Sequence, residues 1–155
     1  MIEINFKCNF KESLSSLFES GIESYSVVKP TNGRPDCIYL KIKDGRTLRL
    51  SSYINELDNW DEIGSLKLDV LQPTASQINF KKLTSKWCSI KRASRLVIHD
   101  ETIKADCGLK FINELDHFLI ILPSSFPNRV EIKSTFYDGD FEPECDLVQY
   151  SEVKL

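Results

Sequence analysis

The sequence has none of the short motifs that mark a nucleotide-binding or hydrolase site. No GxGxxG, GxxxxGKS/T or GxSxG segment occurs in its 155 residues, so neither a phosphate-binding loop nor a nucleophile elbow is predicted. Only two histidines are present, His99 and His117, and they lack HxH or HExxH spacing. A histidine-rich metal site is therefore excluded by count. Catalysis by a cysteine or serine with one histidine stays open, because triad residues can be distant in sequence, but structural or solvent-facing histidines are the favoured interpretation.

Long apolar runs and paired cysteines are also missing. The longest apolar run is five residues, Phe118 to Leu122, against the roughly 18 residues of a membrane span. The first residues, Met1 to Asn5, have neither a basic region nor an apolar region, so no signal peptide is predicted. The five cysteines are scattered without CxxC spacing: Cys8, Cys37, Cys88, Cys107 and Cys145. This pattern favours buried thiols in a reducing cytoplasm, with no disulfide framework, no metal and no cofactor.

The segment from Cys107 to Ser134 is predicted to form the centre of the fold. Alternating residues 108–112 precede a polar turn at 113–116, and the apolar run to Leu122 is stopped by Pro123. A run this short predicts a strand that is covered on both faces. Residues 130–133 alternate again, so three sequential strands with short connections favour an antiparallel meander. The expected central residues are Phe111, Leu119, Ile121, Val130 and Ile132.

The rest of the chain is also rich in predicted strands. They cover residues 2–6, 22–29, 37–43, 47–51, 66–70, 96–98 and 147–153, and residues 78–92 are ambiguous. Turns are expected at Asn32-Gly33 and Asp44-Gly45. An apolar stripe predicts a helix over 11–20 capped by Asn9, and Ser52 is a candidate cap for a second helix over 53–60. The fold class is therefore α+β and β-rich, one domain over 1–155 with a large antiparallel sheet or two and one or two short helices.

Two segments of the chain resemble each other. Residues 36–42 align with residues 106–111, and each segment continues through a polar turn into a second strand. The second strands are followed by Ser51-Ser52-Tyr53 in one case and Ser124-Ser125-Phe126 in the other. Two interpretations stay open: an internal duplication of a hairpin-plus-strand unit, or chance similarity between strands of like composition.

A basic stretch lies between Lys81 and Arg95. It holds six cations and no acidic residue, and Trp87 lies among them. One interpretation is a phosphate-contacting patch with an aromatic side chain for base stacking. The other, favoured because the net charge is −3, is a solvated region whose cations pair with the acidic segments.

Two acidic segments carry charge of the opposite sign. Glu56, Asp58, Asp61 and Glu62 surround Trp60. In the second segment, carboxylates alternate through 138–146 near Phe136 and two other aromatic residues. Three interpretations of this second segment stay open: a Ca²⁺ site, which lacks the EF-hand pattern, a surface for a basic protein partner, or a solvated loop.

The chain resembles small cytoplasmic immunity proteins of bacterial toxin–immunity systems, including contact-dependent inhibition. The resemblance lies in size, in isolated acidic patches, and in the hydrophobic segments 107–111, 118–123 and 127–132. It implies a non-enzymatic protein that binds one cognate toxin domain and blocks its active site or its target. Many such toxins are basic nucleases, and acidic patches on their inhibitors mimic or repel nucleic acid. The basic stretch departs from that pattern.

We therefore expect a protein that binds a cognate toxin, a basic nuclease-type domain, with no membrane and no small-molecule substrate. The alternative is a small nucleic-acid-binding or regulatory protein that uses residues 81–95. In the first case carboxylates would steer and pair with the partner's cations, and aromatic residues would anchor it. The expected partner-binding residues are Glu56, Asp58, Trp60, Asp61, Glu62, Asp138, Asp140, Phe141, Glu142 and Glu144.

Overall fold

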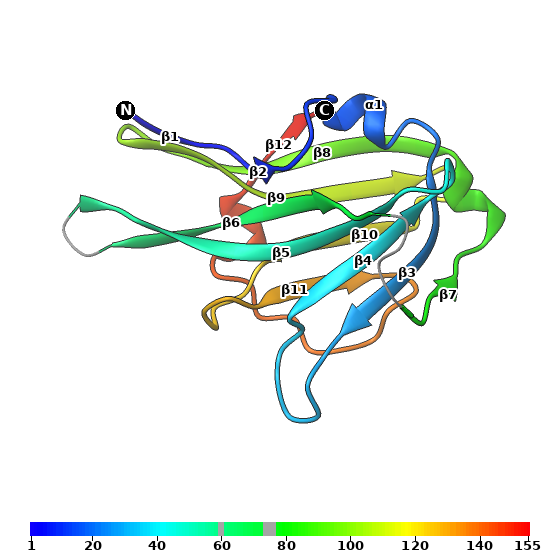
Figure 1. Ribbon diagram of the computed structural model, residues 1–155. Coiled ribbons are helices and arrows are strands. Elements are labelled where there is room, and N and C mark those ends of the chain that lie inside the picture. The colour runs from blue at the N-terminus through cyan, green and yellow to red at the C-terminus, as the bar shows by residue number, and fades with distance from the viewer. Residues whose placement is uncertain (59–60, 73–76) are drawn as a thin grey trace.

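The computed structural model describes residues 1–58, 61–72 and 77–155, which form two six-stranded sheets packed face to face (Figure 1). Sheet A has the order β11 (Val130–Ser134), β10 (Phe118–Pro123), β9 (Ile103–Asn113), β8 (Ile90–His99) and β12 (Ser151–Lys154), and β1 (Ile2–Ile4) pairs in parallel with β9. Sheet B has the order β2 (Lys7–Cys8), β6 (Glu62–Val70), β5 (Thr47–Glu56), β4 (Cys37–Ile42), β3 (Ile22–Val28) and β7 (Lys81–Lys82). The short helical pieces are α1 (Leu14–Leu17) and the 3₁₀ turns η2 (Ser85–Cys88) and η3 (Leu147–Gln149). The predicted β-rich fold with large antiparallel sheets is therefore confirmed.

The two sheets repeat one topology. Strands β3 to β6 form an antiparallel meander in sheet B, and β8 to β11 form one in sheet A. In each sheet the following strand returns to pair antiparallel with the first strand of the meander, β7 with β3 and β12 with β8. The similar segments 36–42 and 106–111 lie at β4 and β9, the second strands of the two meanders. The similarity in sequence thus coincides with a repeat in topology.

The main core lies between the sheets. Sheet A contributes the five residues expected to be central, Phe111, Leu119, Ile121, Val130 and Ile132, all of which are buried in it. Sheet B contributes alternating residues of three strands: Ile38, Leu40, Ile42, Leu48, Leu50, Leu66 and Leu68. Alternation places these side chains on one face of each sheet, so the two faces bury each other.

A second core covers the opposite face of sheet A. Ile120 and Leu122 alternate with the residues that face sheet B, and both are buried in this second cluster. Tyr150 and Ile63 also belong to it, and Phe141 packs against it from the acidic segment. β10 is therefore covered on both faces, as its unbroken apolar run predicted.

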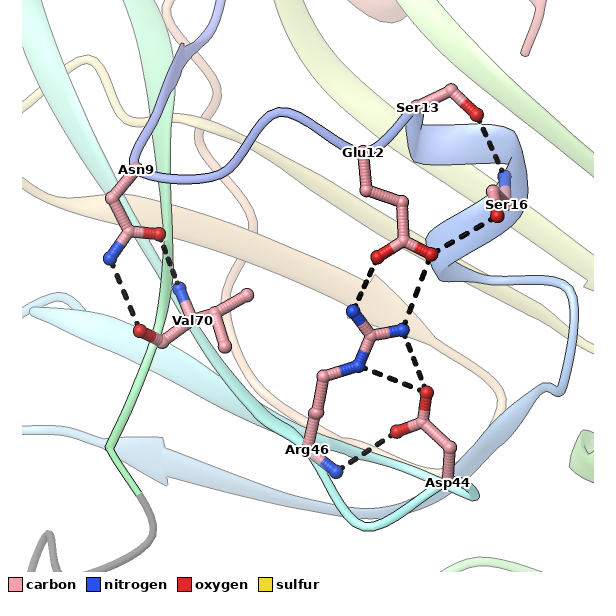
Figure 2. Close-up of polar contacts among 7 residues, drawn as sticks. All are labelled: Asn9, Glu12, Ser13, Ser16, Asp44, Arg46 and Val70. Atoms are coloured by element: carbon pink, nitrogen blue, oxygen red, sulfur yellow. Dashed lines mark hydrogen bonds and ion pairs between the residues drawn. The ribbon is translucent and has the colours of Figure 1, made fainter.

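The predicted first helix is shorter than expected and starts later. α1 is confined to Leu14–Leu17, and its N-cap is Ser13, whose side chain accepts a bond from the Ser16 N–H at 3.1 Å. The prediction of Asn9 as cap is wrong, because its side-chain amide pairs instead with the backbone of Val70 at 2.8 and 3.1 Å (Figure 2). That pairing prolongs the contact between β2 and β6 beyond the strand.

The segment before α1 is also tied to the β4–β5 hairpin by charge. Arg46 lies between Glu12 and Asp44 and forms ion pairs with both (Figure 2). Asp44 accepts from the Arg46 N–H at 3.0 Å, within the predicted Asp44-Gly45 turn, where Gly45 has a φ of 99°. The positive φ explains the glycine at this turn.

The predicted second helix over 53–60 is wrong for residues 53–56, which are part of β5, and residues 59–60 of that prediction lie outside the described residues. β5 continues to Glu56 because it pairs with β6 along its whole length. The Ser52 hydroxyl donates to the Arg129 carbonyl at 2.8 Å instead of capping a helix. β8 is likewise longer than the strand expected at 96–98, and residues 147–149 form a 3₁₀ turn before the last strand. None of the helices in the described part of the chain has the length and hydrophobicity of a membrane span.

Candidate protein-binding surface

The first acidic segment lies at the end of the hairpin formed by β5 and β6, which projects from one end of the sandwich (Figure 1). The two strands stay in register out to Glu56 opposite Glu62, and the Leu57 N–H donates to the Asp61 carbonyl at 2.7 Å. Sequence-distant contacts hold the base of the hairpin, where the Ser65 hydroxyl donates to the carbonyl of Asp106 in β9. The long, regular ladder explains why the acidic residues are carried away from the core.

The hairpin carboxylates are exposed and have no ionic partner within the described residues. Glu56, Asp58, Asp61 and Glu62 are all solvent-exposed, and no ion pair within 4.0 Å involves them in that part of the chain. Glu56 and Glu62 are direct cross-strand partners, and like charges in that position destabilise a hairpin. Trp60, the predicted aromatic anchor, lies outside the described residues. The arrangement concentrates negative charge that has no ionic partner in the part of the chain that the structure describes.

The carboxylates of the second acidic segment have different surroundings from one another. Asp138 and Asp140 are exposed. Glu142 pairs with Arg34 at 2.6 Å, and Phe141 is half-buried with the Lys133 ammonium 5.7 Å from its ring centre. These residues do not present one free acidic face, because part of the segment is bound to the body of the protein.

A buried ion pair underlies the second acidic segment. Glu131 in β11 is fully buried, and its Oε1 lies 3.4 Å from Arg34 and accepts from the Glu142 N–H at 2.7 Å. Its Oε2 has no hydrogen-bond partner among the described residues. Arg34 thus connects the β3–β4 loop to both Glu131 and Glu142, which holds the segment against the edge of sheet A.

Glu144 joins the two acidic segments. Its Oε2 accepts from the Gly64 N–H at 2.7 Å, just beyond the acidic end of the hairpin. A side chain at position 64 has no room, since a Cβ there would lie 2.6 Å from the Pro123 Cβ and 2.8 Å from Glu144 Oε2. Burial raises the pKa of Glu144, the Gly64 bond lowers it, and the Glu62 carboxylate raises it. The structure therefore brings the predicted residues Glu62 and Glu144 together, but it uses Glu144 as an internal contact.

The turn η3 presents an exposed apolar pair within residues 147–153, which the sequence predicts as a strand. Val148 is 93% exposed and Leu147 is 37% exposed. The turn is fixed by the Asp146 N–H, which donates to Gln149 Oε1 at 2.8 Å, and by the Gln149 N–H, which donates to the Asp146 carbonyl at 2.9 Å. An acidic residue followed three positions later by glutamine is a capping-box spacing, which was the available signal for this turn.

The residue that follows the exposed apolar pair is buried in the same core as a residue of the hairpin. Tyr150, which follows η3, is buried in the second core together with Ile63 of β6. We call Glu56, Asp58, Asp61, Glu62, Leu147 and Val148 the hairpin surface. Its members are exposed apolar side chains and carboxylates without an ionic partner among the described residues, a combination that suits a basic protein partner more than a small ligand.

The basic stretch is divided between the two sheets and partly neutralised. Lys91 pairs with Asp116 at 3.0 Å, Arg95 with Asp106 at 3.1 Å, and Arg92 lies 4.0 Å from Glu152. The prediction that these cations pair with the acidic segments is therefore wrong for these three. Trp87 is 2% exposed and packs edge-on against Phe136, so it is not placed to stack on a base. Lys81 and Lys82 lie in the separate strand β7.

The described thiols and histidines show no catalytic arrangement. Burial raises the pKa of Cys107 to about 12 and also raises the pKa of Cys8, Cys37 and Cys145, which keeps these thiols protonated. His99 and His117 are both exposed, in β8 and beside β10. Over residues 1–58, 61–72 and 77–155, no group of three or more metal-ligating side chains is clustered.

Comparison with known proteins finds no matching family model, no matching curated protein and no matching solved structure.

Proposed function

We propose that the protein binds and neutralises a basic protein, a toxin domain of the nuclease type, through the hairpin surface. The observation that carries the proposal is the set of four exposed carboxylates at the end of a projecting hairpin, none of which has an ionic partner among the described residues. Glu56 lies directly opposite Glu62, and this repulsion between like charges has a cost that a basic partner would offset. The proposed role is non-enzymatic, because the protein would act by binding alone. It is also cytoplasmic, because the proposed toxin would act on nucleic acid in that compartment.

The apolar pair supplies the second part of the proposed contact. Rigid exposed apolar residues lose little conformational entropy on binding, and contacts at the centre of an interface carry most of its energy. Leu147 and Val148 are fixed by the bonds of η3 and are therefore already placed for contact. We expect the carboxylates to govern the association rate and the apolar pair to govern the dissociation rate.

The first experiment is coexpression of the tagged protein with the product of the adjacent upstream gene. A stoichiometric complex that relieves growth inhibition by that product supports the proposal. A clean monomer, with no toxic neighbour and no bound protein, contradicts it. In that case retention on nucleic acid at low salt would test the alternative role of residues 81–95.

The second experiment maps the surface with variants of equal charge change. E56K/D61K reverses two hairpin carboxylates, and the control E19K/E101K reverses two exposed carboxylates elsewhere. The hairpin variant is expected to lower the association rate by about tenfold or more at low salt, and the control by much less. Equal effects of the two variants would show that only net charge matters and would overturn the assignment of the hairpin surface.

A further inference from the structure

Sheet A ends in an exposed strand whose edge is unoccupied in the described part of the chain. β12 (Ser151–Lys154) pairs with β8 on one side, and Ser151, Glu152 and Lys154 are exposed. At the other end of the sheet, the Val130 N–H of β11 is bonded to the Pro35 carbonyl at 2.9 Å. The outer strands of sheet B, β2 and β7, have two residues each. β11 is longer, with five residues, but its first three residues are buried, whereas three of the four residues of β12 are exposed.

The direction of the backbone groups in β12 follows from its pairing with β8. The Leu155 N–H donates to the Ala93 carbonyl at 3.0 Å, so residue 155 directs its polar groups toward β8. Alternate residues of a strand direct these groups to the same side, so Val153 also faces β8. The N–H and C=O groups of Glu152 and Lys154 consequently point away from β8, toward the open edge.

We propose that β12 is a dimerisation edge, at which two copies of the chain pair antiparallel around a two-fold axis at Val153. In this register Glu152 of each copy lies opposite Lys154 of the other. Both residues direct their backbone groups to the open edge, so each such pair exchanges both of its N–H to C=O bonds. The contact joins the two copies of sheet A into one continuous sheet and removes an exposed edge.

Charge selects this register over its neighbours. Moving the two-fold axis by one residue, to Glu152 or to Lys154, keeps the backbone groups in line but places two glutamates or two lysines directly opposite each other. Like charges in that position are destabilising, whereas opposite charges contribute favourably. Within the described residues Lys154 has no carboxylate within 4.0 Å, while Glu152 pairs with Lys110 of the same chain. The second copy therefore supplies the partner that Lys154 lacks.

Charged residues often protect an outer strand from pairing with another chain. Here the signs alternate in a self-complementary order, so the same residues favour one partner, a second copy, over strands in general. The pairing involves few residues, and a small interface of this kind is expected to be weak and concentration-dependent. It can be tested independently of the proposed toxin binding, because neither experiment below requires a toxin. The hairpin carboxylates belong to sheet B, whereas Leu147 and Val148 of the hairpin surface lie in η3, just before β12.

The first test is sedimentation velocity over a concentration series. The wild-type chain is expected to shift from monomer to dimer. Lys154→Pro removes an N–H that faces the open edge and leaves the pairing with β8 in place, so it should abolish the shift while circular dichroism and unfolding stay unchanged. Lys154→Glu should also abolish it, and the exchanged variant E152K/K154E should restore it. A monomer at every concentration, or a dimer unaffected by Lys154→Pro, would overturn the proposal.

The second test fixes the register by cross-linking. Residues on a two-fold axis in a pair without hydrogen bonds have Cα atoms about 4.5 Å apart, within the range that a disulfide spans. In a C8S background, Val153→Cys should therefore form a disulfide-linked dimer under mild oxidation, identified by mass spectrometry of the linked peptide. Ser151→Cys is the matched control, since its two copies lie on opposite sides of the axis. Equal cross-linking of both variants, or none with Val153→Cys, would overturn the register.

Discussion

The two acidic segments have similar charge in the sequence and opposite roles in the structure. In the hairpin, Glu56, Asp58, Asp61 and Glu62 are exposed, and no ion pair in the described residues involves them. In the second segment, the Glu142 side chain pairs with Arg34 and Glu144 accepts from Gly64. One segment is available to a partner, while the other is partly used to close the second core.

The difference shows that a count of carboxylates does not locate a binding surface. A carboxylate that already accepts hydrogen bonds within the fold must lose them before it can pair with a partner, whereas an unpaired one loses only water. Reversal of a hairpin charge should therefore affect binding and leave stability intact or improved. Reversal of a charge in the second segment should affect stability.

The largest effect is expected from Arg34→Met, which removes the partner of the fully buried Glu131. Loss of one member of a buried pair leaves an uncompensated charge, so we expect destabilisation of about 3 kcal/mol in urea unfolding. The double variant R34M/E131Q should recover part of that loss, because the glutamine is neutral.

The control for this change is Arg129→Met. Arg129 pairs with Asp36 at 2.7 Å, but their side chains are 40% and 41% exposed. An exposed pair of this kind contributes less than about 1 kcal/mol. If Arg34→Met cost no more than Arg129→Met, the second acidic segment would not be held by a buried charge, and the contrast between the segments would fail.

Gly64→Ala tests the junction between the segments. The added Cβ would lie 2.6 Å from Pro123 Cβ, an atom of a rigid ring, and 2.8 Å from Glu144 Oε2. Overpacking at such a site costs about 2 kcal/mol. Gly139→Ala, within the second segment, is the control, because its nearest contact is a Tyr137 ring atom at 3.2 Å. Equal unfolding midpoints for the two variants would show that the junction is loose.

Sequence patterns predicted the strands whose signals are local. The five-residue apolar run at β10 indicated burial on both faces, and Asp44-Gly45 indicated a hairpin turn; both are confirmed. The second half of β5 could not be predicted in this way, because residues 52–56 show no clear alternation. They are extended because β6 supplies their backbone partners. The helix predicted over 11–20 is shorter in the structure for two reasons. Its serines are poor helix formers, and Asn9, the predicted cap, is bound to Val70.

The sequence predicted which acidic residues form the candidate site, but it did not predict which of them are free to bind a partner. The sequence identified both acidic segments. However, Glu142 pairs with Arg34 and Glu144 accepts a hydrogen bond from Gly64, and both partners are distant in the sequence. Nothing local distinguishes a free carboxylate from a bound one. The exposed apolar pair at Leu147 and Val148 was missed because two apolar residues fit a strand as well as a turn.

Glu56→Lys should stabilise the hairpin, in contrast to a charge reversal in the second acidic segment. The change replaces a like-charged cross-strand pair with Glu62 by an opposite-charged one, worth about 0.5 kcal/mol at low salt. High salt should reduce the gain by screening. The matched reversal Glu142→Lys, which breaks the pair with Arg34, should destabilise instead. Thermal unfolding at two salt concentrations measures both, and a loss of stability in Glu56→Lys would mean that the hairpin charges have a structural partner.

The smallest effect is expected in the pH dependence of the junction. Burial raises the pKa of Glu144 above 4.5, the usual glutamate value, so the folded protein binds this proton more tightly than the unfolded chain does. The contribution of Glu144 to stability is therefore present at low pH and falls as pH rises from about 4.5 through the raised pKa. Glu144→Gln keeps an acceptor for the Gly64 N–H without the charge, so the stability of the wild type relative to this variant should decline over that interval. Asp138→Asn controls for the loss of one charge from the same segment. Parallel curves for wild type and Glu144→Gln would show that partial burial of this carboxylate has no cost, and that the two acidic segments meet in solvent.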